Sequence, residues 1–198
     1  MSTDRSGLTP SGRRSALLIV DVQNDFCPGG ALAVAHGDSV VAPLNRHIAL
    51  AVAQGIPVYA SRDWHPASTS HFKPYGGPWP VHCVEMTQGA AFHPDLCLPG
   101  SNIVITKGEQ PDRPGYSVFE GHTSEGKPFL TDLLEREIGR LRVGGLATDY
   151  CVRASVLDAL AEGFEVSLLG DAIAGVDLDK GDSERAISEM RAAGAEYP

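Results

Sequence analysis

Short apolar runs recur along the chain and alternate with segments of helical spacing. Five of these runs are rich in β-branched residues and have few polar interruptions, and they span residues 16–22, 57–63, 102–108, 141–147 and 165–171. Strands that are apolar on both faces belong to a parallel sheet that is covered on each side. The pattern therefore predicts a buried, mainly parallel sheet.

The segments between the strands carry apolar residues at the three- and four-residue spacing of amphipathic helices. In the first of them, Asp38 is a plausible N-cap and Gly55 a stop signal. The predicted helices span residues 38–55, 127–139, 151–163 and, more weakly, 183–194. A βαβ series with right-handed crossovers gives an α/β fold with an open, mainly parallel sheet in a three-layer α-β-α arrangement, which is Rossmann-like.

The chain has the length of one α/β domain. Residues 1–15 are rich in Ser, Arg, Gly and Pro and are expected to be a flexible tail, so the single domain is placed at residues 16–198. The stretch from His65 to Gly100 breaks the alternation with prolines, glycines and aromatic residues. Long irregular segments inside a domain are usually functional loops, which predicts an active-site wall here.

Charge and cysteine use narrow the class of protein. The formal net charge is −9 and no basic stripe compensates for it, so nucleic acid is not expected as a partner. The apolar runs are too short for a membrane span, and membrane association is not expected either. The four cysteines lie far apart and follow no signal peptide, which predicts reduced thiols and a cytoplasmic location.

Reactive side chains follow several of the predicted strands. Asp21, Asp63 and Lys107 come at the ends of the first three strands, and Cys151 begins the helix after the fourth. Ligands of open α/β sheets bind beyond the carboxyl ends of the strands, so these four side chains are predicted to converge on one edge.

Cys151 is the candidate nucleophile. A nearby ammonium or a helix N-terminus lowers a thiol pKa from its free value of about 8.5, and Lys107 and the predicted helix supply both influences. Asp21 is placed to take the thiol proton and return it to a leaving amine. Taken singly, a cysteine is more often an inert core residue and an aspartate a turn cap, so the prediction depends on their convergence.

A second group of residues has the donors of a metal site. Asp63, His65 and His82 supply a carboxylate and two imidazoles, a set that zinc, iron and manganese accept. His71 is a less certain fourth residue, which would bind the ion directly or through water. The alternative is chance, because a histidine is more often a surface residue. The remaining histidines, His36, His47, His93 and His122, are interpreted as structural or solvated.

The ordered motifs resemble those of the nicotinamidases (pyrazinamidases) of the isochorismatase-like cysteine hydrolase superfamily. The matching stretches lie between residues 16 and 194 and are "LLIVDVQNDFCPGGAL", "SRDWHP", "GGPWPVHC", "GAAFHP", "TKG", "YSVFEG" and "GLATDYCV". The resemblance implies that Asp21, Lys107 and Cys151 are a catalytic triad and that Asp25 is not the base. It also implies that Asp63, His65 and His82 bind one divalent transition metal, whereas His71 matches a position that is a ligand in some members and serine in others.

The same resemblance assigns residues to the substrate pocket and the oxyanion hole. Phe26, Trp79 and Tyr116 match residues that line it, the backbone amides of Ala147 and Cys151 match the oxyanion hole, and a cis peptide is implied just before Ala147. Since the chain stops at "AEYP", the last edge strand of the family is expected to be very short.

The expected activity is metal-dependent hydrolysis of nicotinamide to nicotinate and ammonia through a cysteine thioester, with pyrazinamide as a further substrate. Two alternatives remain at this stage. One is another amidohydrolase of the superfamily, with a carbamoyl, ureido or maleamate-type substrate, and the other is a non-catalytic metal or thiol sensor. A homo-oligomer is left open.

Overall fold

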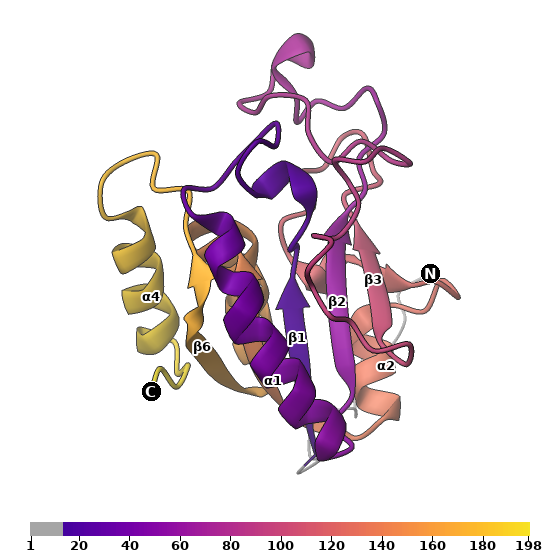
Figure 1. Cartoon of the computed structure of the whole chain (residues 1–198), viewed down its shortest axis with the longest axis vertical. Helices are drawn as coiled ribbons and strands as arrows, with labels where there is room; N and C mark the ends of the chain where they lie inside the picture. The colour runs from indigo at the N-terminus through magenta and orange to yellow at the C-terminus, as the bar shows by residue number, and fades with distance from the viewer. Residues whose placement is uncertain (1–13) are drawn as a thin grey trace.

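The computed structural model describes residues 14–198, and its centre is a six-stranded sheet (Figure 1). Its strands lie in the order β4-β3-β2-β1-β5-β6, and all neighbours are parallel except β4, which runs antiparallel to β3. The strands are β1 Arg14–Val20, β2 Val58–Asp63, β3 Ile103–Lys107, β4 His122–Thr123, β5 Ile138–Leu146 and β6 Glu165–Ala174. The predicted mainly parallel sheet is confirmed, and β4 is a two-residue addition that the sequence pattern did not indicate.

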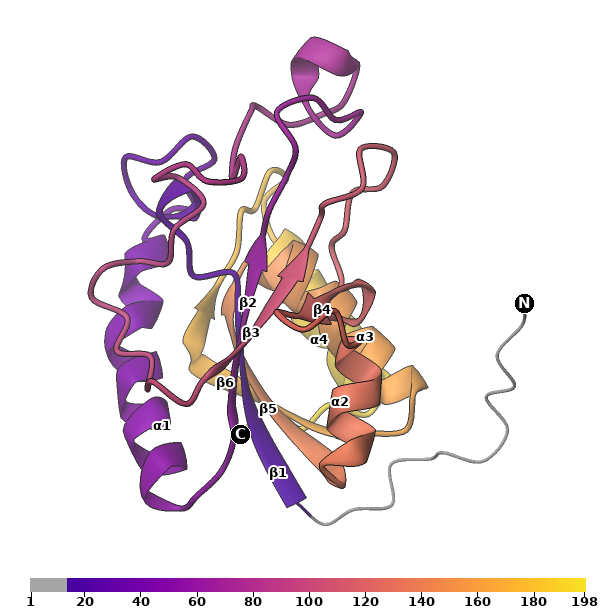
Figure 2. The same cartoon turned by 90° about the vertical axis from the view of Figure 1, so that its right-hand side faces the viewer.

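In the part of the chain that the structure describes, four α-helices cover the two faces of this sheet. α1 lies on one face, and the other three lie on the opposite face (Figure 2). They are α1 Val41–Ala53, α2 Phe129–Glu135, α3 Arg153–Ala161 and α4 Asp182–Ala192. This confirms the expected three layers. Among the residues from 14 onward, no helix combines the length and the apolar character needed to cross a bilayer.

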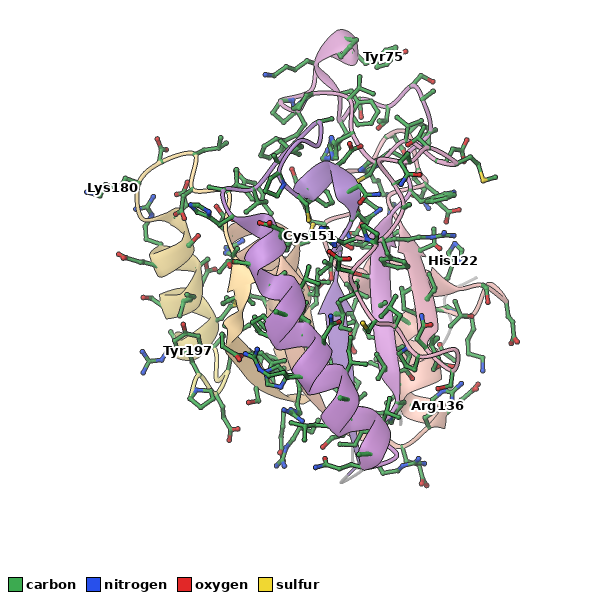
Figure 3. The ribbon with its side chains drawn as sticks, viewed as in Figure 1. Tyr75, His122, Arg136, Cys151, Lys180 and Tyr197 are labelled. Atoms are coloured by element: carbon green, nitrogen blue, oxygen red, sulfur yellow. The ribbon has the colours of Figure 1, made fainter. Side chains whose placement is uncertain are left out.

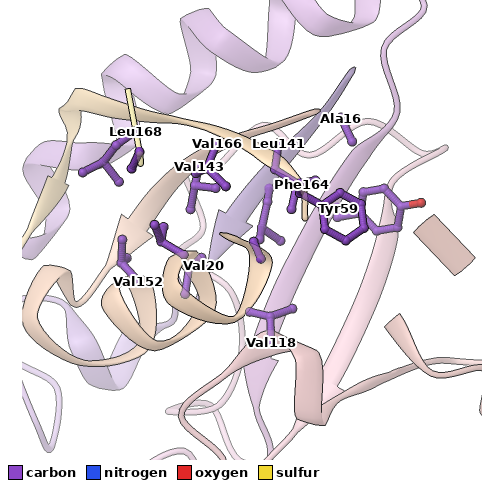
Figure 4. Close-up of a cluster of buried hydrophobic side chains, with 14 of the residues drawn as sticks. Ala16, Val20, Tyr59, Val118, Leu141, Val143, Val152, Phe164, Val166 and Leu168 are labelled. Atoms are coloured by element: carbon purple, nitrogen blue, oxygen red, sulfur yellow. The ribbon is translucent and has the colours of Figure 1, made fainter. Parts of the chain in front are cut away.

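The central strand β1 shows why both layers form. Leu17 and Ile19 are fully buried and pack in the cluster under α1. Ala16, Leu18 and Val20 alternate with them and enter the cluster on the opposite face, where Figure 4 shows Ala16 and Val20 among apolar side chains of the later strands and helices. Since successive side chains of a strand point to opposite faces, a continuous apolar run supplies both cores.

The predicted helix over residues 127–139 is too long. α2 ends at Glu135, and Ile138, which lies within the predicted helical range, instead begins β5 beside Arg14 of β1. The break lies at Glu137, whose φ of 56° is left-handed and cannot continue a right-handed helix. Ile138 is buried either way, which is why helical spacing alone misassigned it.

Three further predictions concern the ends of elements, and each can be compared with the structure. Asp38 does not cap α1, because a 3-10 turn over Gly37–Val40 precedes the helix. The tail predicted over residues 1–15 overlaps β1 at Arg14 and Ser15, and its remainder lies outside the described residues. The very short last edge strand is present as a single parallel bridge between Glu196 and Ser167 of β6.

The strand order positions the site. From β1 the chain proceeds through β2 and β3 on one side, whereas β5 and β6 lie on the other side. The connections therefore diverge between β1 and β5, and in open α/β sheets this switch point leaves a crevice at the carboxyl ends of the strands.

Candidate active site

The four reactive side chains predicted at strand ends converge at this crevice. Asp21 follows β1, Asp63 and Lys107 are the last residues of β2 and β3, and Cys151 lies in a π-helical turn, Thr148–Val152, after β5. Figure 3 shows Cys151 beyond the upper end of β1. One ligand atom from each of Asp21, Asp63 and Cys151 lies within 4.8 Å of the other two.

The ammonium of Lys107 joins these groups. Its Nζ lies 2.8 Å from Asp21 Oδ2, donates to Gly115 O at 2.9 Å and to Cys151 Sγ at 3.5 Å, and also contacts Asp63 Oδ1. The side chain is fully buried. Burial by itself lowers the pKa of a lysine, but the carboxylates of Asp21 and Asp63 outweigh it and raise the pKa of Lys107 well above its ordinary value. Lys107 is thus a fixed buried cation.

The two carboxylates that share this cation have different properties. Burial raises the pKa of Asp21, and the attraction of Lys107 offsets this only in part. Burial acts in the same direction on Asp63, but there Lys107 and His65 prevail and hold its pKa below the ordinary value. Pairs of carboxyl groups whose pKa values are pushed apart divide into a proton acceptor and a permanent anion.

Asp21 is held in a form suited to accepting a proton. Its φ of 49° is in the left-handed region, which non-glycine residues seldom occupy and which is concentrated at functional sites. Its Oδ1 accepts a hydrogen bond of 2.7 Å from Ser61 Oγ. Its Oδ2 has an ion-pair contact with Lys107 but no aligned donor among the described residues, so a lone pair remains for the thiol proton.

The expectation of a lowered thiol pKa is wrong for the protein without substrate. Burial raises the pKa of Cys151 well above its ordinary value, and the attraction of Lys107 does not compensate, partly because Asp21 and Asp63 repel a thiolate. Cys151 is therefore a thiol in the resting site. It requires a base at the moment of attack, and Asp21 is the neighbouring one.

Three imidazoles form a buried cluster on the other side of Asp63. One ring nitrogen from each of His65, His71 and His82 lies within 4.8 Å of the other two, and His65 Nε2 is 3.7 Å from Asp63 Oδ2. The structure thus includes His71, the least certain residue of the predicted set, in the cluster.

Hydrogen bonds orient two of these rings. His65 Nδ1 lies 2.9 Å from Gly108 O, and His82 Nδ1 lies 2.7 Å from Pro80 O. Each carbonyl can only accept, so Nδ1 is the donor in both rings, and the Nε2 atoms are left for another partner. His65 Nε2 is buried and has no hydrogen-bond partner among the described residues. A buried ring nitrogen without a hydrogen-bond partner fits a metal ligand.

The charge state of the cluster also fits a cation. Burial, with the nearby rings of His65 and His82, lowers the pKa of His71 to about 4, and burial lowers the pKa of His82. Both rings are neutral at neutral pH, and Asp63 is ionised. Three imidazoles and one carboxylate match a divalent transition metal such as zinc, iron or manganese.

Gln23, which no motif marked as a site residue, supports this cluster through hydrogen bonds. Its fully buried side chain donates to Asp63 O at 2.8 Å and to Ala90 O at 2.9 Å, and it accepts from Asp63 N at 2.8 Å. The amide thus ties the end of β2 to the irregular segment. A buried glutamine within the run "VDVQNDF" was the available signal.

The predicted wall residues surround one pocket. Phe26, Trp79, Tyr116 and Ala147 line it together with Asp63, His71, His82 and Cys151. The indole of Trp79 donates to Tyr116 Oη at 2.8 Å. Leu32, Tyr150 and Val176 also line the pocket and were missed, because nothing in their local pattern distinguishes them from core residues. The Tyr150 ring contacts Trp79 and Tyr116 at centroid distances of 4.9 and 5.8 Å.

The structure also locates the expected cis peptide, Asp25 and two of the histidines outside the metal set. The peptide between Leu146 and Ala147 is cis, as implied. Asp25 accepts from the amides of Ala31 and Cys83 and so holds loop backbone. His47 contacts Asp171, and His122 contacts Glu109, in partly exposed pairs that use neither histidine in the site.

Comparisons with known proteins show what this chain is similar to. Residues 15–197 match the family model of the isochorismatase domain. The chain is 46% identical over 196 residues to the nicotinamidase of Escherichia coli K12, covering 91% of this chain and 92% of that protein. A solved structure of Pyrococcus horikoshii pyrazinamidase in complex with zinc superimposes with a TM-score of 0.86 at 42% identity, covering 93% and 98% of the two chains. PnC1 from L. infantum in complex with nicotinate gives a TM-score of 0.81 at 35% identity, covering 96% and 94%.

Proposed function

The chain belongs to the isochorismatase family, and from this premise we propose that it is a nicotinamidase, an amidohydrolase that converts nicotinamide to nicotinate and ammonia. The observation that carries the proposal is one aromatic-lined pocket bordered by a buried thiol with its base and by a carboxylate–imidazole cluster. Nicotinamide has a carboxamide on one side of its ring and a ligand nitrogen on the other. Pyrazinamide has the same two features and is a further substrate.

The ring end of the substrate is recognised at the imidazole cluster. Asp63, His65, His71 and His82 would hold one divalent transition ion, with His71 as a direct ligand because its nitrogen belongs to the same compact group as those of His65 and His82. The bound ion would supply a Lewis-acidic centre at this end of the pocket. Phe26, Trp79 and Tyr116 enclose the flat ring.

Cys151 attacks the carboxamide carbon. As the Sγ–C bond forms, the thiol proton passes to Asp21 Oδ2, and the carbonyl electron pair moves to oxygen. The backbone amides of Ala147 and Cys151 stabilise this oxyanion, and one such donor contributes about 3 kcal/mol in known enzymes. Lys107 compensates the negative charge that surrounds the sulfur.

Asp21 then completes the cycle. It gives its proton to the amide nitrogen, the C–N bond breaks, and ammonia leaves a thioester on Cys151. Water attacks the thioester carbon while Asp21 takes a proton from it, the C–S bond breaks, and the proton returns to sulfur. The raised pKa of Asp21 suits a group that both accepts and donates a proton.

The direct test is ammonia release from a panel of amides, with and without a chelator. The panel contains nicotinamide, pyrazinamide and carbamoyl, ureido and maleamate-type compounds. We expect turnover of the first two and its loss on metal removal. Preference for a carbamoyl or ureido compound, in a protein that holds no stoichiometric metal, would overturn the proposal in favour of the other amidohydrolases considered above.

The nucleophile is tested by Cys151→Ala. We expect the rate to fall by about 10⁴-fold or more, because a missing nucleophile leaves only binding and oxyanion stabilisation. Metal content and the circular dichroism spectrum are expected to be unchanged. Cys97→Ala, at an exposed thiol, is the matched control. Retained turnover in Cys151→Ala would discard the thioester mechanism.

A further inference from the structure

The loop between β6 and α4, residues 175–181, contributes to the pocket wall. It connects the end of β6 to the start of α4 (Figure 1). Its Val176 lines the pocket. The mechanism proposed above assigns this loop no part.

Asp149 ties this loop to the turn that carries the nucleophile. It lies two residues before Cys151 in the same π-helical turn. Its Oδ1 accepts from Val176 N at 2.9 Å, and its Oδ2 accepts from Asp177 N at 2.8 Å. Two consecutive amides bound by one carboxylate form a charge-assisted, two-point contact that fixes orientation as well as distance. We refer to these two bonds as the Asp149 clasp.

Further hydrogen bonds join the loop to α4. Asp177, with a left-handed φ of 50°, accepts from Ser183 N at 2.8 Å and from Ser183 Oγ at 2.7 Å, in the first turn of α4. At the near end, a Cβ on Gly175 would lie 1.7 Å from Ser183 Oγ and 3.2 Å from Asp149 Oδ1. The loop backbone at Gly175 therefore packs directly against the side chains of both Ser183 and Asp149.

Apolar burial contributes little to the loop beyond Val176. Leu178 is 67% exposed, and Asp177 and Asp179 are exposed as well. Segments with few buried apolar contacts open at low free-energy cost unless hydrogen bonds hold them. The clasp is placed where it restrains the one loop side chain that faces the substrate pocket.

We propose that Asp149 is a positioning residue that holds Val176 against the pocket and so limits the size of the aromatic amide that the site accepts. The size limit for amides rests on the proposed function. A purely structural Asp149 would reduce activity on all substrates alike, whereas a positioning Asp149 changes the ratio between substrates of different size.

The first experiment compares nicotinamide with 5-methylnicotinamide. In Asp149→Ala and in Val176→Ala, we expect kcat/KM for the methylated amide relative to nicotinamide to rise about tenfold, the size of effect one methyl group has in a fitted pocket. Asp149→Asn keeps one acceptor oxygen and should give a smaller rise. Asp158→Ala, at an exposed aspartate of α3, is the matched control and should leave the ratio unchanged.

The double variant Asp149→Ala/Val176→Ala tests whether the two residues act together. If the clasp works through Val176, the double variant shows about the same ratio as either single variant. Each single substitution already removes the restriction that the Val176 side chain places on the pocket, so the second one adds nothing. An unchanged ratio in Asp149→Ala, or effects that multiply in the double variant, would overturn the proposal.

A second readout does not depend on amidase activity. The rates at which Cys151 is alkylated by iodoacetamide and by bulkier N-phenyl iodoacetamide are measured on the Cys151 peptide by mass spectrometry. We expect Asp149→Ala and Val176→Ala to accelerate the bulky reagent about tenfold more than the small one, and Asp158→Ala to accelerate neither selectively. If the wild-type protein fails to hydrolyse nicotinamide but this selectivity shift appears, the proposed function fails and the clasp stands. If nicotinamide is hydrolysed and no shift appears, the clasp fails alone.

Discussion

The two halves of the site are built on different kinds of backbone. The strand half consists of Asp21, Asp63, Lys107 and Cys151, which lie at or just beyond the carboxyl ends of β1, β2, β3 and β5. His65, His71 and His82, the loop half, belong to a segment whose regular structure is one 3-10 turn and a few isolated bridges. Asp63, at the end of β2, joins the two halves, because it contacts both Lys107 and His65.

The two halves are also held by different forces. In the strand half, a buried cation and two carboxylates compensate one another, so position and electrostatic balance depend on the same atoms. In the loop half, hydrogen bonds to Gly108 O and Pro80 O orient two of the rings. Damage to the strand half is therefore expected to affect stability and catalysis together, and damage to the loop half to affect metal affinity first.

Lys107→Met is the largest expected perturbation. It leaves Asp21 and Asp63 buried without their shared cation, and breaking a buried ionic group in this way costs about 3–5 kcal/mol of unfolding free energy. Turnover is expected to fall by about 10⁴-fold, as for loss of a triad member. Urea unfolding and ammonia release measure the two effects. Lys127→Met, at a partly exposed lysine, is the control, and a Lys107→Met protein of wild-type stability would show that the strand half is not electrostatically coupled.

His71→Ala perturbs the loop half. Loss of a direct ligand is expected to weaken zinc binding by about 100-fold or more, above the effect typical of residues that only support a ligand. The metal-free protein should lose no more than about 2 kcal/mol of stability, since a buried ring is truncated without orphaning an ion pair. Calorimetric zinc titration is the measurement, with His93→Ala as the loop control. Undiminished affinity in His71→Ala would remove His71 from the ligand set.

Gln23→Leu tests the support of Asp63, the residue that joins the two halves. It leaves the backbone N–H and C=O of Asp63 and the C=O of Ala90 without their side-chain partner, which is expected to cost about 3 kcal/mol. Because Asp63 is then less well held, zinc affinity should fall about tenfold. Asn24→Ala removes a comparable amide bond, to Gln88 O on the exposed side, and should change affinity little. Equal effects of the two variants would mean that Gln23 has no particular role in the site.

Ser61→Ala gives the smallest expected effect, a shift in pH dependence. Asp21 has to be ionised to accept the thiol proton, and the Ser61 hydroxyl stabilises that ionised form. Its removal raises the already elevated pKa of Asp21, so the acid limb of kcat/KM should move to higher pH by about half a unit to one unit. Ser70→Ala, whose hydroxyl bonds Pro111 O at the surface, should leave the profile in place. A shift toward lower pH would exclude Asp21 as the group responsible.

The strand half was the more predictable one. Asp21, Asp63 and Lys107 end continuous apolar runs, and parallel strands carry their carboxyl ends to one edge, so their convergence follows from periodicity. His71, in contrast, is less predictable, because the matching family position is histidine in some members and serine in others. The irregular, proline-rich backbone around it also has no period from which the direction of a side chain could be read. Tyr150 and Val176 were missed for a related reason, since one pocket collects side chains from segments far apart in the sequence.

The sequence by itself determined the layer order, the residues at the strand ends and the chemistry that they can carry, because apolar spacing and residue type are local properties. Only the tertiary structure decided the protonation of that chemistry. The expected lowering of the Cys151 pKa is reversed by burial, and Asp21 and Asp63, which are alike in sequence, diverge because one has an additional imidazole partner. Desolvation and charge–charge distance depend on everything packed around a group, and no local pattern contains that information.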